Sequence, residues 1–283
     1  MNEDLKNKVA IITGSSMGIG KAIAEELATR GVNLVLNGRD PEKLKITEAE
    51  LRSRGAKVIS VIADVRSPDE CNKLVNDCIE TFGRVDILVN NAGVTSRGSI
   101  EQMNPNVLHQ VMDTNFLGSV FPTQAALPYL KKTKGHVIFI NSIAGFVSIP
   151  YSSLYSCSKI AQSAMVDALR IELEGTGIHI GIAYCSFVQN DSRKKILEHN
   201  GKWVYLPQRK NVLRDKPLHV ARRIVDMITS RSPKIIFTFI GKLTYFIERT
   251  FPWLIRLIFR FNRRKVRDEY TFIGGDMVYK ATA

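Results

Sequence analysis

Residues 9–28 read VAIITGSSMGIGKAIAEELA, and this stretch decides the fold. Its first four residues are apolar and predict a buried strand, whereas the pattern from Ile19 onward predicts a helix. The turn between them, TGSSMGIG at residues 13–20, contains three glycines, which let backbone amides approach a phosphate group. The dipole and free N–H groups of the following helix favour the anion. The alternative is a glycine-rich turn that merely ends a strand.

Short apolar runs alternate with helical patterns over the first 185 residues. The runs are Val9–Ile12, Asn33–Leu36, Lys57–Ile62, Ile87–Val89, His136–Ile140 and Ile178–Tyr184. Such alternation is typical of a parallel sheet with crossover helices on both faces. We therefore predict an α/β protein with a single Rossmann-type, doubly wound parallel sheet. The catalytic domain is expected at residues 1–232, followed by a basic and apolar extension at 233–283.

The positive charge of the chain is concentrated at its carboxyl end. The net charge is +13, but residues 193–283 hold 21 Lys and Arg against 7 Asp and Glu, whereas residues 1–192 hold 19 against 20. The body is thus close to neutral, and the extension is expected to meet an anionic surface.

The four cysteines, Cys71, Cys78, Cys157 and Cys185, are spaced too irregularly for a disulfide framework or paired metal clips. No metal site is predicted, and the cytoplasm is the expected location. The polar segment before Val9 does not resemble a secretion signal.

Asn37-Gly38-Arg39-Asp40 follows the second predicted strand. A carboxylate at this place binds a ribose 2′-hydroxyl, whereas a guanidinium pairs with a 2′-phosphate. Arg39 therefore favours NADP(H), and Asp40 is expected to cap the next helix before Pro41. Asp64-Val65 ends the third strand and contacts the adenine or simply caps a turn.

Tyr155-Ser156-Cys157-Ser158-Lys159 opens a predicted helix, and the four-residue separation places the phenol and the ammonium on one face. A phenol has a pKa of about 10, so proton exchange near neutral pH requires a nearby cation and a hydrogen-bond donor. Lys159 is the candidate cation.

Over roughly its first 190 residues the chain resembles the short-chain dehydrogenase/reductases. The shared motifs are TGSSMGIG (13–20), Asp64-Val65, NNAG (90–93), Asn115 within DTNFLG, Ser142 within INSIAG, and YSCSK (155–159). Ser142 precedes Tyr155 by thirteen residues and Asn115 precedes it by forty, and the family shows both spacings.

The resemblance implies the roles of the site residues. Tyr155 would protonate the developing alkoxide, Ser142 would bind the carbonyl oxygen, Lys159 would lower the pKa of Tyr155 and hold the nicotinamide ribose, and Asn115 would anchor a proton-relay water. Ser142 as a strand-end cap and Asn115 as a helix-bend residue are the structural alternatives. The predicted cofactor-binding residues are Gly14, Ser16, Gly18, Ile19, Gly20, Arg39, Asp64, Val65, Asn91, Ala92, Gly93, Tyr155, Lys159, Val188 and Asn190.

The chain departs from the family pattern after Tyr184. Members usually carry Pro-Gly and then a Thr, whereas this chain has CSFVQN at residues 185–190. Asn190 is the expected substitute for the Thr. Without the Pro-Gly, the sequence does not predict the backbone conformation of this stretch. Residues 190–216 lack periodicity and are expected to form a mobile cover over the site or an insertion.

A basic amphipathic helix is predicted from Pro252. Its apolar face holds Trp253, Leu254, Leu257, Ile258 and Phe261, and its opposite face holds Arg256, Arg260, Arg263 and Arg264. This pattern favours a helix lying on an anionic membrane through residues 252–264. The alternative is packing on the body or on a second subunit. Nucleic-acid binding is not expected, because recognition motifs and interleaved aromatic residues are missing from the sequence.

Together these features predict an NADP(H)-dependent oxidoreductase that reduces a carbonyl, or oxidises an alcohol, of a lipophilic small molecule. The resemblance further implies a homo-oligomer and a relation to the lipid- and steroid-acting branches. A 3-oxoacyl thioester reductase and a non-catalytic NADP-binding scaffold at a membrane are the competing hypotheses.

Overall fold

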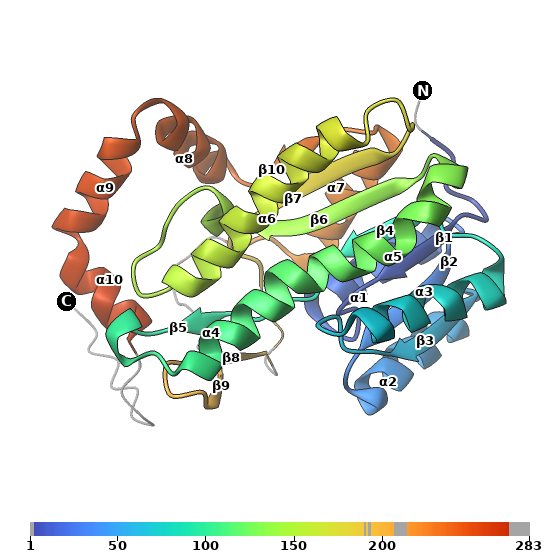
Figure 1. Cartoon of the computed structure of the whole chain (residues 1–283), viewed down its shortest axis with the longest axis horizontal. Coiled ribbons are helices and arrows are strands. Elements are labelled where there is room, and N and C mark those ends of the chain that lie inside the picture. The colour runs from blue at the N-terminus through green and yellow to red at the C-terminus, as the bar shows by residue number, and fades with distance from the viewer. Residues whose placement is uncertain (1–2, 190, 192–193, 207–213, 272–283) are drawn as a thin grey trace.

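The computed structural model describes residues 3–189, 191, 194–206 and 214–271 (Figure 1). Within these residues a parallel sheet has seven strands in the order β10-β7-β6-β4-β1-β2-β3. The strands are β1 (Val9–Ile12), β2 (Asn33–Gly38), β3 (Val58–Ile62), β4 (Ile87–Asn90), β6 (His136–Ser142), β7 (His179–Cys185) and β10 (Lys234–Ile236). The predicted Rossmann-type sheet is therefore confirmed.

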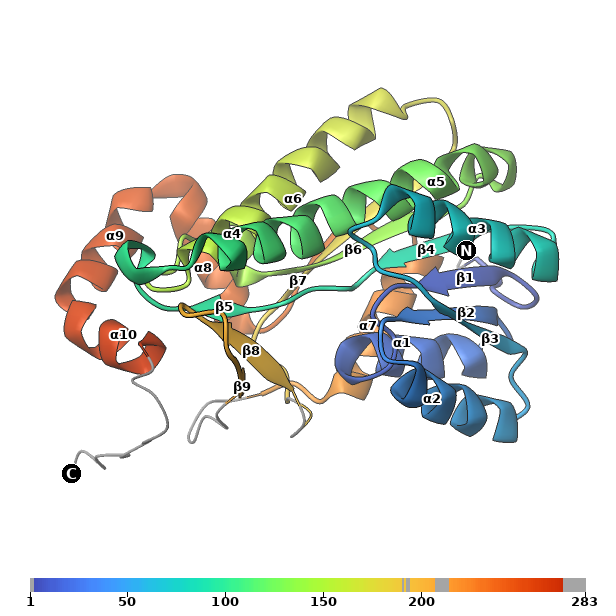
Figure 2. The same cartoon turned by 60° about the horizontal axis from the view of Figure 1, so that its bottom comes forward.

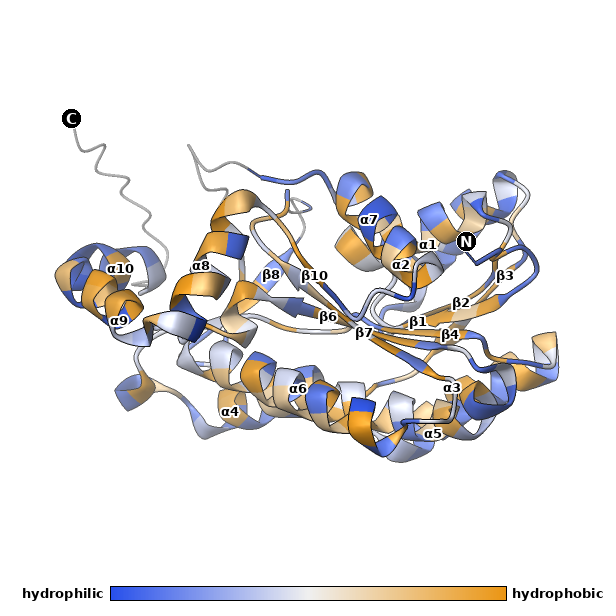
Figure 3. Cartoon of the chain, turned by 90° about the horizontal axis from the view of Figure 1, so that it is seen from above, coloured by the Kyte–Doolittle hydropathy of each residue, from blue (hydrophilic) through white to orange (hydrophobic). Residues whose placement is uncertain are grey.

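Helices cover both faces of this sheet (Figure 3). One layer consists of α1 (Gly18–Thr29), α2 (Pro41–Ser53) and α7 (Pro217–Thr229). The other consists of α3 (Pro68–Phe82), α4 (Pro105–Met112), α5 (Gly118–Thr133) and α6 (Ser153–Glu172). Double coverage explains why strands such as β1, β4 and β7 are buried along their whole length and read as unbroken apolar runs.

The strand order reverses between β1 and β4. From β1 the chain builds β2 and β3 on one side, then crosses to place β4 on the other. The loops that leave the carboxyl ends of these two strands therefore diverge, and ligands of such sheets bind in the crevice that opens there.

The chain between β5 and β6 contains two helices, α4 and α5. Between α4 and α5 the chain makes a π-helical turn, Asp113–Leu117. Such wide turns are frequent at functional sites, and this one contains Asn115.

A second, three-stranded sheet lies outside the central one. Strand β5 (Ser96–Arg97) pairs in parallel with β8 (Lys195–Glu198), which pairs antiparallel with β9 (Trp203–Tyr205). Part of the segment expected as a mobile cover thus has regular structure. Strands of two to four residues are too short to show periodicity.

The carboxyl-terminal extension is helical. Because β10 joins the central sheet, the body extends past the expected boundary at residue 232. It is followed by α8 (Phe239–Thr250), α9 (Pro252–Phe261) and α10 (Arg263–Tyr270). Pro252 begins α9 as predicted, but the helix ends at Phe261, so Arg263 and Arg264 belong to α10. In Figures 1 and 2 these three helices lie at one end of the molecule, and α10 is near β5.

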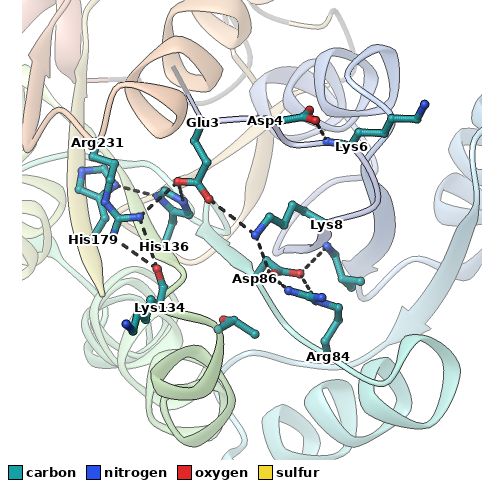
Figure 4. A network of polar contacts seen from close by, with 12 residues as sticks. Glu3, Asp4, Lys6, Lys8, Arg84, Asp86, Lys134, His136, His179 and Arg231 are labelled. Atoms are coloured by element: carbon teal, nitrogen blue, oxygen red, sulfur yellow. Dashed lines mark hydrogen bonds and ion pairs between the residues drawn. The ribbon is translucent and has the colours of Figure 1, made fainter. Parts of the chain in front are cut away.

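A polar network joins the amino-terminal segment to the amino-terminal ends of β6 and β7, at the end of the sheet opposite the crevice (Figure 4). The Glu3 carboxylate lies 3.1 Å from His136 Nε2, 3.2 Å from Arg231 Nη1 and 3.7 Å from Lys8 Nζ. The Nδ1 atoms of His136 and His179 are 3.1 Å apart, and both rings are buried. Glu3 thus ties the start of the chain to β6 and to the end of α7.

Glu3→Ala is expected to lower the free energy of unfolding by about 1–2 kcal/mol, because it removes the carboxylate partner of buried His136 and of Arg231. Asp4→Ala is the matched control. The Asp4 carboxylate accepts one exposed hydrogen bond from Lys6 N, so its loss should change stability by less than about 0.5 kcal/mol. Urea denaturation of both variants tests this, and equal effects would contradict the proposed role of Glu3.

Candidate active site

Three glycines shape the turn after β1. Gly14 and Gly18 have φ of 62° and 60°, in the left-handed region that favours glycine. A Cβ on Gly20 would lie 2.4 Å from Asn91 Nδ2 and 2.4 Å from Gly14 O. The turn therefore packs directly against the loop after β4 and is more than the end of a strand.

Thr13 and Asn91 hold this contact together. The Thr13 hydroxyl accepts hydrogen bonds from the backbone N–H groups of Asn91 (2.9 Å) and Ala92 (3.0 Å). Asn91 Nδ2 donates to the carbonyl oxygens of Thr13 and Gly14, both at 2.9 Å. The side chain of Met17 does not cap α1, so the first N–H groups of the helix are left for another acceptor.

Charged side chains surround the end of β2. Arg39 Nη1 lies 3.7 Å from Asp64 Oδ2, and the Arg39 side chain is 48% exposed. Arg66 holds Asp64 more closely, at 2.6 Å, and hydrogen bonds from Arg66 keep the pKa of Asp64 low even though burial opposes this. Asp40 caps α2 by accepting a hydrogen bond from Lys43 N, as predicted. Arg39 is thus loosely held and faces solvent.

A single cleft of about 580 Å³, within the usual size range of small-molecule sites, gathers most of the predicted residues. They are Gly14, Ser16, Gly18, Ile19, Arg39, Asp64, Val65, Asn91, Ala92, Gly93, Ser142, Tyr155, Lys159 and Val188. Gly20 and Asn115 support the cleft from behind its lining. Asn190 lies outside the described residues.

Asn115 is fully buried in the π-helical turn. Its Oδ1 accepts a hydrogen bond from Val94 N (2.7 Å), and its Nδ2 donates to Val94 O and to Ser158 Oγ, both at 2.9 Å. The amide therefore connects the loop after β4 to α6, next to Lys159. This agrees with a residue that satisfies backbone groups, and the proton-relay role stays a prediction.

Ser142 and Tyr155 meet at the carboxyl end of β6. The Ser142 hydroxyl accepts a hydrogen bond from Ala144 N (3.3 Å), so the residue does cap the strand end. Burial raises the pKa of Tyr155 to about 12, and a hydrogen bond with Ser142 opposes the rise. Ser142 thus both caps β6 and contacts the phenol.

Lys159 lies beneath the cleft and is 5% exposed. Its ammonium donates to Ile140 O at 2.8 Å, and burial lowers its pKa to about 8. In this arrangement burial dominates the pKa of Tyr155, so the lowering expected from Lys159 stays a prediction for the complex with cofactor.

The stretch after β7 lacks the Pro-Gly of the family pattern and is held differently. Val188 forms a parallel bridge with Asp215, made by two backbone hydrogen bonds of 2.9 Å: Asp215 N donates to Phe187 O, and Gln189 N donates to Asp215 O. Val188 reaches the cleft lining by this route.

A family model described as short chain dehydrogenase matches residues 8–201. The chain belongs to the short-chain dehydrogenase family. The resemblance seen in the motifs is thereby confirmed.

Relatives of this chain include 11-beta-hydroxysteroid dehydrogenase 1A of Arabidopsis thaliana, which is 40% identical over 192 residues. These residues are 67% of this chain and 55% of that protein. Dehydrogenase/reductase SDR family member 7B of Danio rerio is 30% identical over 254 residues, 87% of this chain and 82% of that protein. The chain thus spans about half the length of the plant relative.

Among solved structures, the chain is similar to an alcohol dehydrogenase from the archaeon Thermococcus sibiricus, complexed with 5-hydroxy-NADP. The two share 27% identity with a TM-score of 0.72, covering 81% of this chain and 95% of that one.

Several residues at or near the cleft were not predicted from the sequence. Cys185, Lys194, Lys195 and Trp203 line it. Tyr270, at the end of α10, is close enough to Tyr155 to raise its pKa, and its ring lies 4.7 Å from the Arg97 guanidinium carbon. Local patterns do not reveal these residues, because strand pairing and the path of the extension bring them to the site.

Proposed function

We propose that this protein is an NADP(H)-dependent oxidoreductase that reduces a carbonyl, or oxidises an alcohol, of a lipophilic small molecule. The observation that carries the proposal is one cleft lined by the glycine turn, Ser142, Tyr155 and Lys159. The uncapped start of α1 and the glycine positions fit a phosphate-bearing cofactor. The similar archaeal alcohol dehydrogenase is complexed with 5-hydroxy-NADP, which supports the choice of cofactor.

The cofactor would be held by the turn at residues 13–20, by Asn91 to Gly93, and by Arg39 at the 2′-phosphate. When bound, it supplies the hydride for the carbonyl carbon. Ser142 donates a hydrogen bond to the carbonyl oxygen, and the Tyr155 hydroxyl gives that oxygen its proton. Lys159 stabilises the phenolate that remains, because its ammonium is the nearest cation on the same helix face.

A lipophilic substrate is supported by the steroid dehydrogenase names of the plant relatives and by the surface of the extension. The α8–α9 surface consists of the exposed apolar residues Phe239, Ile240, Leu243, Phe246, Phe251, Trp253, Leu257, Ile258 and Phe261. Trp253 is 60% exposed and Phe261 is 80% exposed, so neither packs on the body of the protein.

We further propose that the α8–α9 surface lies on an anionic membrane. Four basic residues on α9 and α10 are near it in the chain: Arg256, Arg260, Arg263 and Arg264. Burial of the apolar side chains and attraction of the arginines to anionic lipid would both favour binding. Of the helices that the structure describes, none combines the length and apolarity needed to cross a bilayer. Figure 3 shows the apolar residues of α8 and α9 at the end of the molecule beyond the sheet.

Tyr155→Phe should reduce the rate of ketone reduction by about 10²- to 10⁴-fold while NADPH still binds, because the proton donor is lost.

In the parent, kcat/KM for reduction should fall as the pH rises through about 8, since deprotonated Lys159 no longer stabilises the phenolate. NADPH oxidation with alkyl ketones and 3-oxoacyl thioesters of increasing length measures both effects. A Tyr155→Phe variant as fast as the parent would refute the mechanism, and a marked preference for thioesters would favour the acyl-reductase alternative.

Arg39→Ala should raise the Kd for NADPH by about 10- to 100-fold and leave that for NADH unchanged, because a charge-assisted hydrogen bond to the 2′-phosphate is lost. Lys45→Ala, on an exposed part of α2, removes the same charge and should leave both affinities unchanged. Fluorescence titration gives the four constants. An Arg39→Ala variant that binds NADPH as well as the parent does would exclude this role.

The double variant Trp253→Gln, Phe261→Gln should bind anionic phosphatidylserine vesicles about 10- to 100-fold more weakly, because two large apolar side chains no longer enter the lipid. Ile171→Gln, at a 74% exposed position on α6, is the control and should bind as the parent does. Vesicle flotation at low and high salt tests this. If the parent protein does not bind the vesicles but self-associates through the α8–α9 surface, that surface is a subunit interface instead.

A further inference from the structure

Lys194 brings a second ammonium group to the cleft that holds Ser142, Tyr155 and Lys159. It directly precedes β8, and its backbone is held on both sides. Lys194 N donates to Asp191 O at 3.0 Å, and Leu206 N donates to Lys194 O at 2.9 Å. The small sheet therefore fixes where this half-buried side chain begins.

The charges around Lys194 place it beside the catalytic groups. Burial lowers its pKa, Arg97 lowers it further, and Cys185 acts in the opposite direction. Lys194 in turn lowers the pKa values of Lys159 and Cys185. The Lys194 side chain is thus close enough to Lys159, Cys185 and Arg97 for their charges to interact, and it lines the same cleft as Lys159 and Cys185.

Arg97, whose charge acts on Lys194, contacts the carboxyl-terminal extension. It is 9% exposed, its register partner on β8 is Glu198, and its guanidinium lies over the ring of Tyr270. Tyr270 also raises the pKa of Tyr155. Lys194 thus lines the same cleft as Tyr155, and Tyr270 lies between Arg97 and the phenol's surroundings, since it contacts the first and acts on the second. Figure 2 shows β5, β8 and α10 on the same side of the molecule.

The Lys194 ammonium has no carboxylate within ion-pair distance among the described residues. Asp191 also lines the cleft, but the contact that Lys194 makes with it is through the backbone. A partly buried cation without a counter-ion is unfavourable, and a second cation nearby increases the cost. An anionic ligand group entering the cleft would relieve it.

We propose that Lys194 binds an anionic group of the substrate, a phosphate or a carboxylate that lies a few bonds from the reacting carbonyl. Arg97 adds to the positive potential around Lys194. The inference rests on the proposed reduction at Tyr155 and names its substrate class. With the α8–α9 surface at the same end of the molecule, the substrate is an anionic amphiphile: a ketone that carries an alkyl chain and a charged head group.

The test uses the full chain with NADPH and three ketones of equal alkyl length: a neutral alkan-2-one, a 4-oxoalkanoate and a 2-oxoalkyl phosphate. The parent should prefer at least one anionic ketone by about tenfold or more in kcat/KM. Lys194→Met should lower kcat/KM for that ketone by about 10- to 100-fold, mainly through KM, and change the neutral ketone by less than about twofold. Lys194→Arg should retain the preference.

Lys202→Met is the matched control. Lys202 is exposed in the turn between β8 and β9 and does not line the cleft. Its replacement by Met removes the same charge as Lys194→Met does. It should leave every rate constant unchanged. A parent that does not distinguish the ketones, or a Lys194→Met variant that loses the neutral and anionic ketones equally, overturns the inference.

Two further readouts separate the possible failures. Fluorescence titration measures NADPH binding, and a raised Kd in Lys194→Met with unchanged ketone selectivity would assign Lys194 to the cofactor diphosphate and overturn the inference. If the parent turns over none of the ketones, the proposed function fails. Calorimetric binding of the same ketones to the NADPH complex then decides the inference, which requires anion-selective binding that Lys194→Met loses.

Discussion

The rest of this structure depends on a close contact between two backbone turns at the point where the strand order reverses. A Cβ on Gly14 would lie 2.9 Å from Ala92 Cα, and one on Gly20 would lie 2.4 Å from Asn91 Nδ2. Larger residues would push the two turns apart. Because Thr13 and Asn91 satisfy the backbone groups at this contact, the two turns stay together and leave the start of α1 facing the cleft. The same cleft reaches Tyr155.

Buried polar groups also connect the loop after β4 and strand β6 to α6, the helix that holds Tyr155 and Lys159. Asn115 connects the loop after β4 with Ser158 on α6, and Lys159 donates to Ile140 O on β6. The cost of this burial is visible in the pKa values, which are raised at Tyr155 and lowered at Lys159. Burial favours the neutral form of both groups, so charges brought by ligands have a large effect on them.

The extension presents two different chemistries. Its outer surface on α8 and α9 is apolar and exposed, whereas the end of α10 turns inward and places Tyr270 beside Arg97. A single segment thereby connects the surface proposed to meet lipid with the surroundings of Tyr155. Lys194, positioned by the small sheet, brings a positive charge to the cleft. A substrate with both an alkyl chain and an anionic group matches this division.

The amino-acid sequence by itself determined the alternation of strands and helices, the glycine turn, the cap at Asp40 and the start of α9 at Pro252. These features depend on local periodicity and on conformational preferences within a few residues, so a sequence pattern suffices to predict them. The four-residue separation pointed to Tyr155 and Lys159, and the resemblance to the family added Ser142. These residues lie close together along the chain, at the end of β6 and the start of α6.

Only the tertiary structure decided the remainder. The pairing of β5 with β8, the place of β10 in the sheet and the approach of Tyr270 to Tyr155 join segments far apart in the chain. Lys194 belongs to a segment without periodicity, and it reaches the cleft because β8 pairs with a strand about a hundred residues earlier. Such contacts depend on long-range packing, which local residue preferences do not encode.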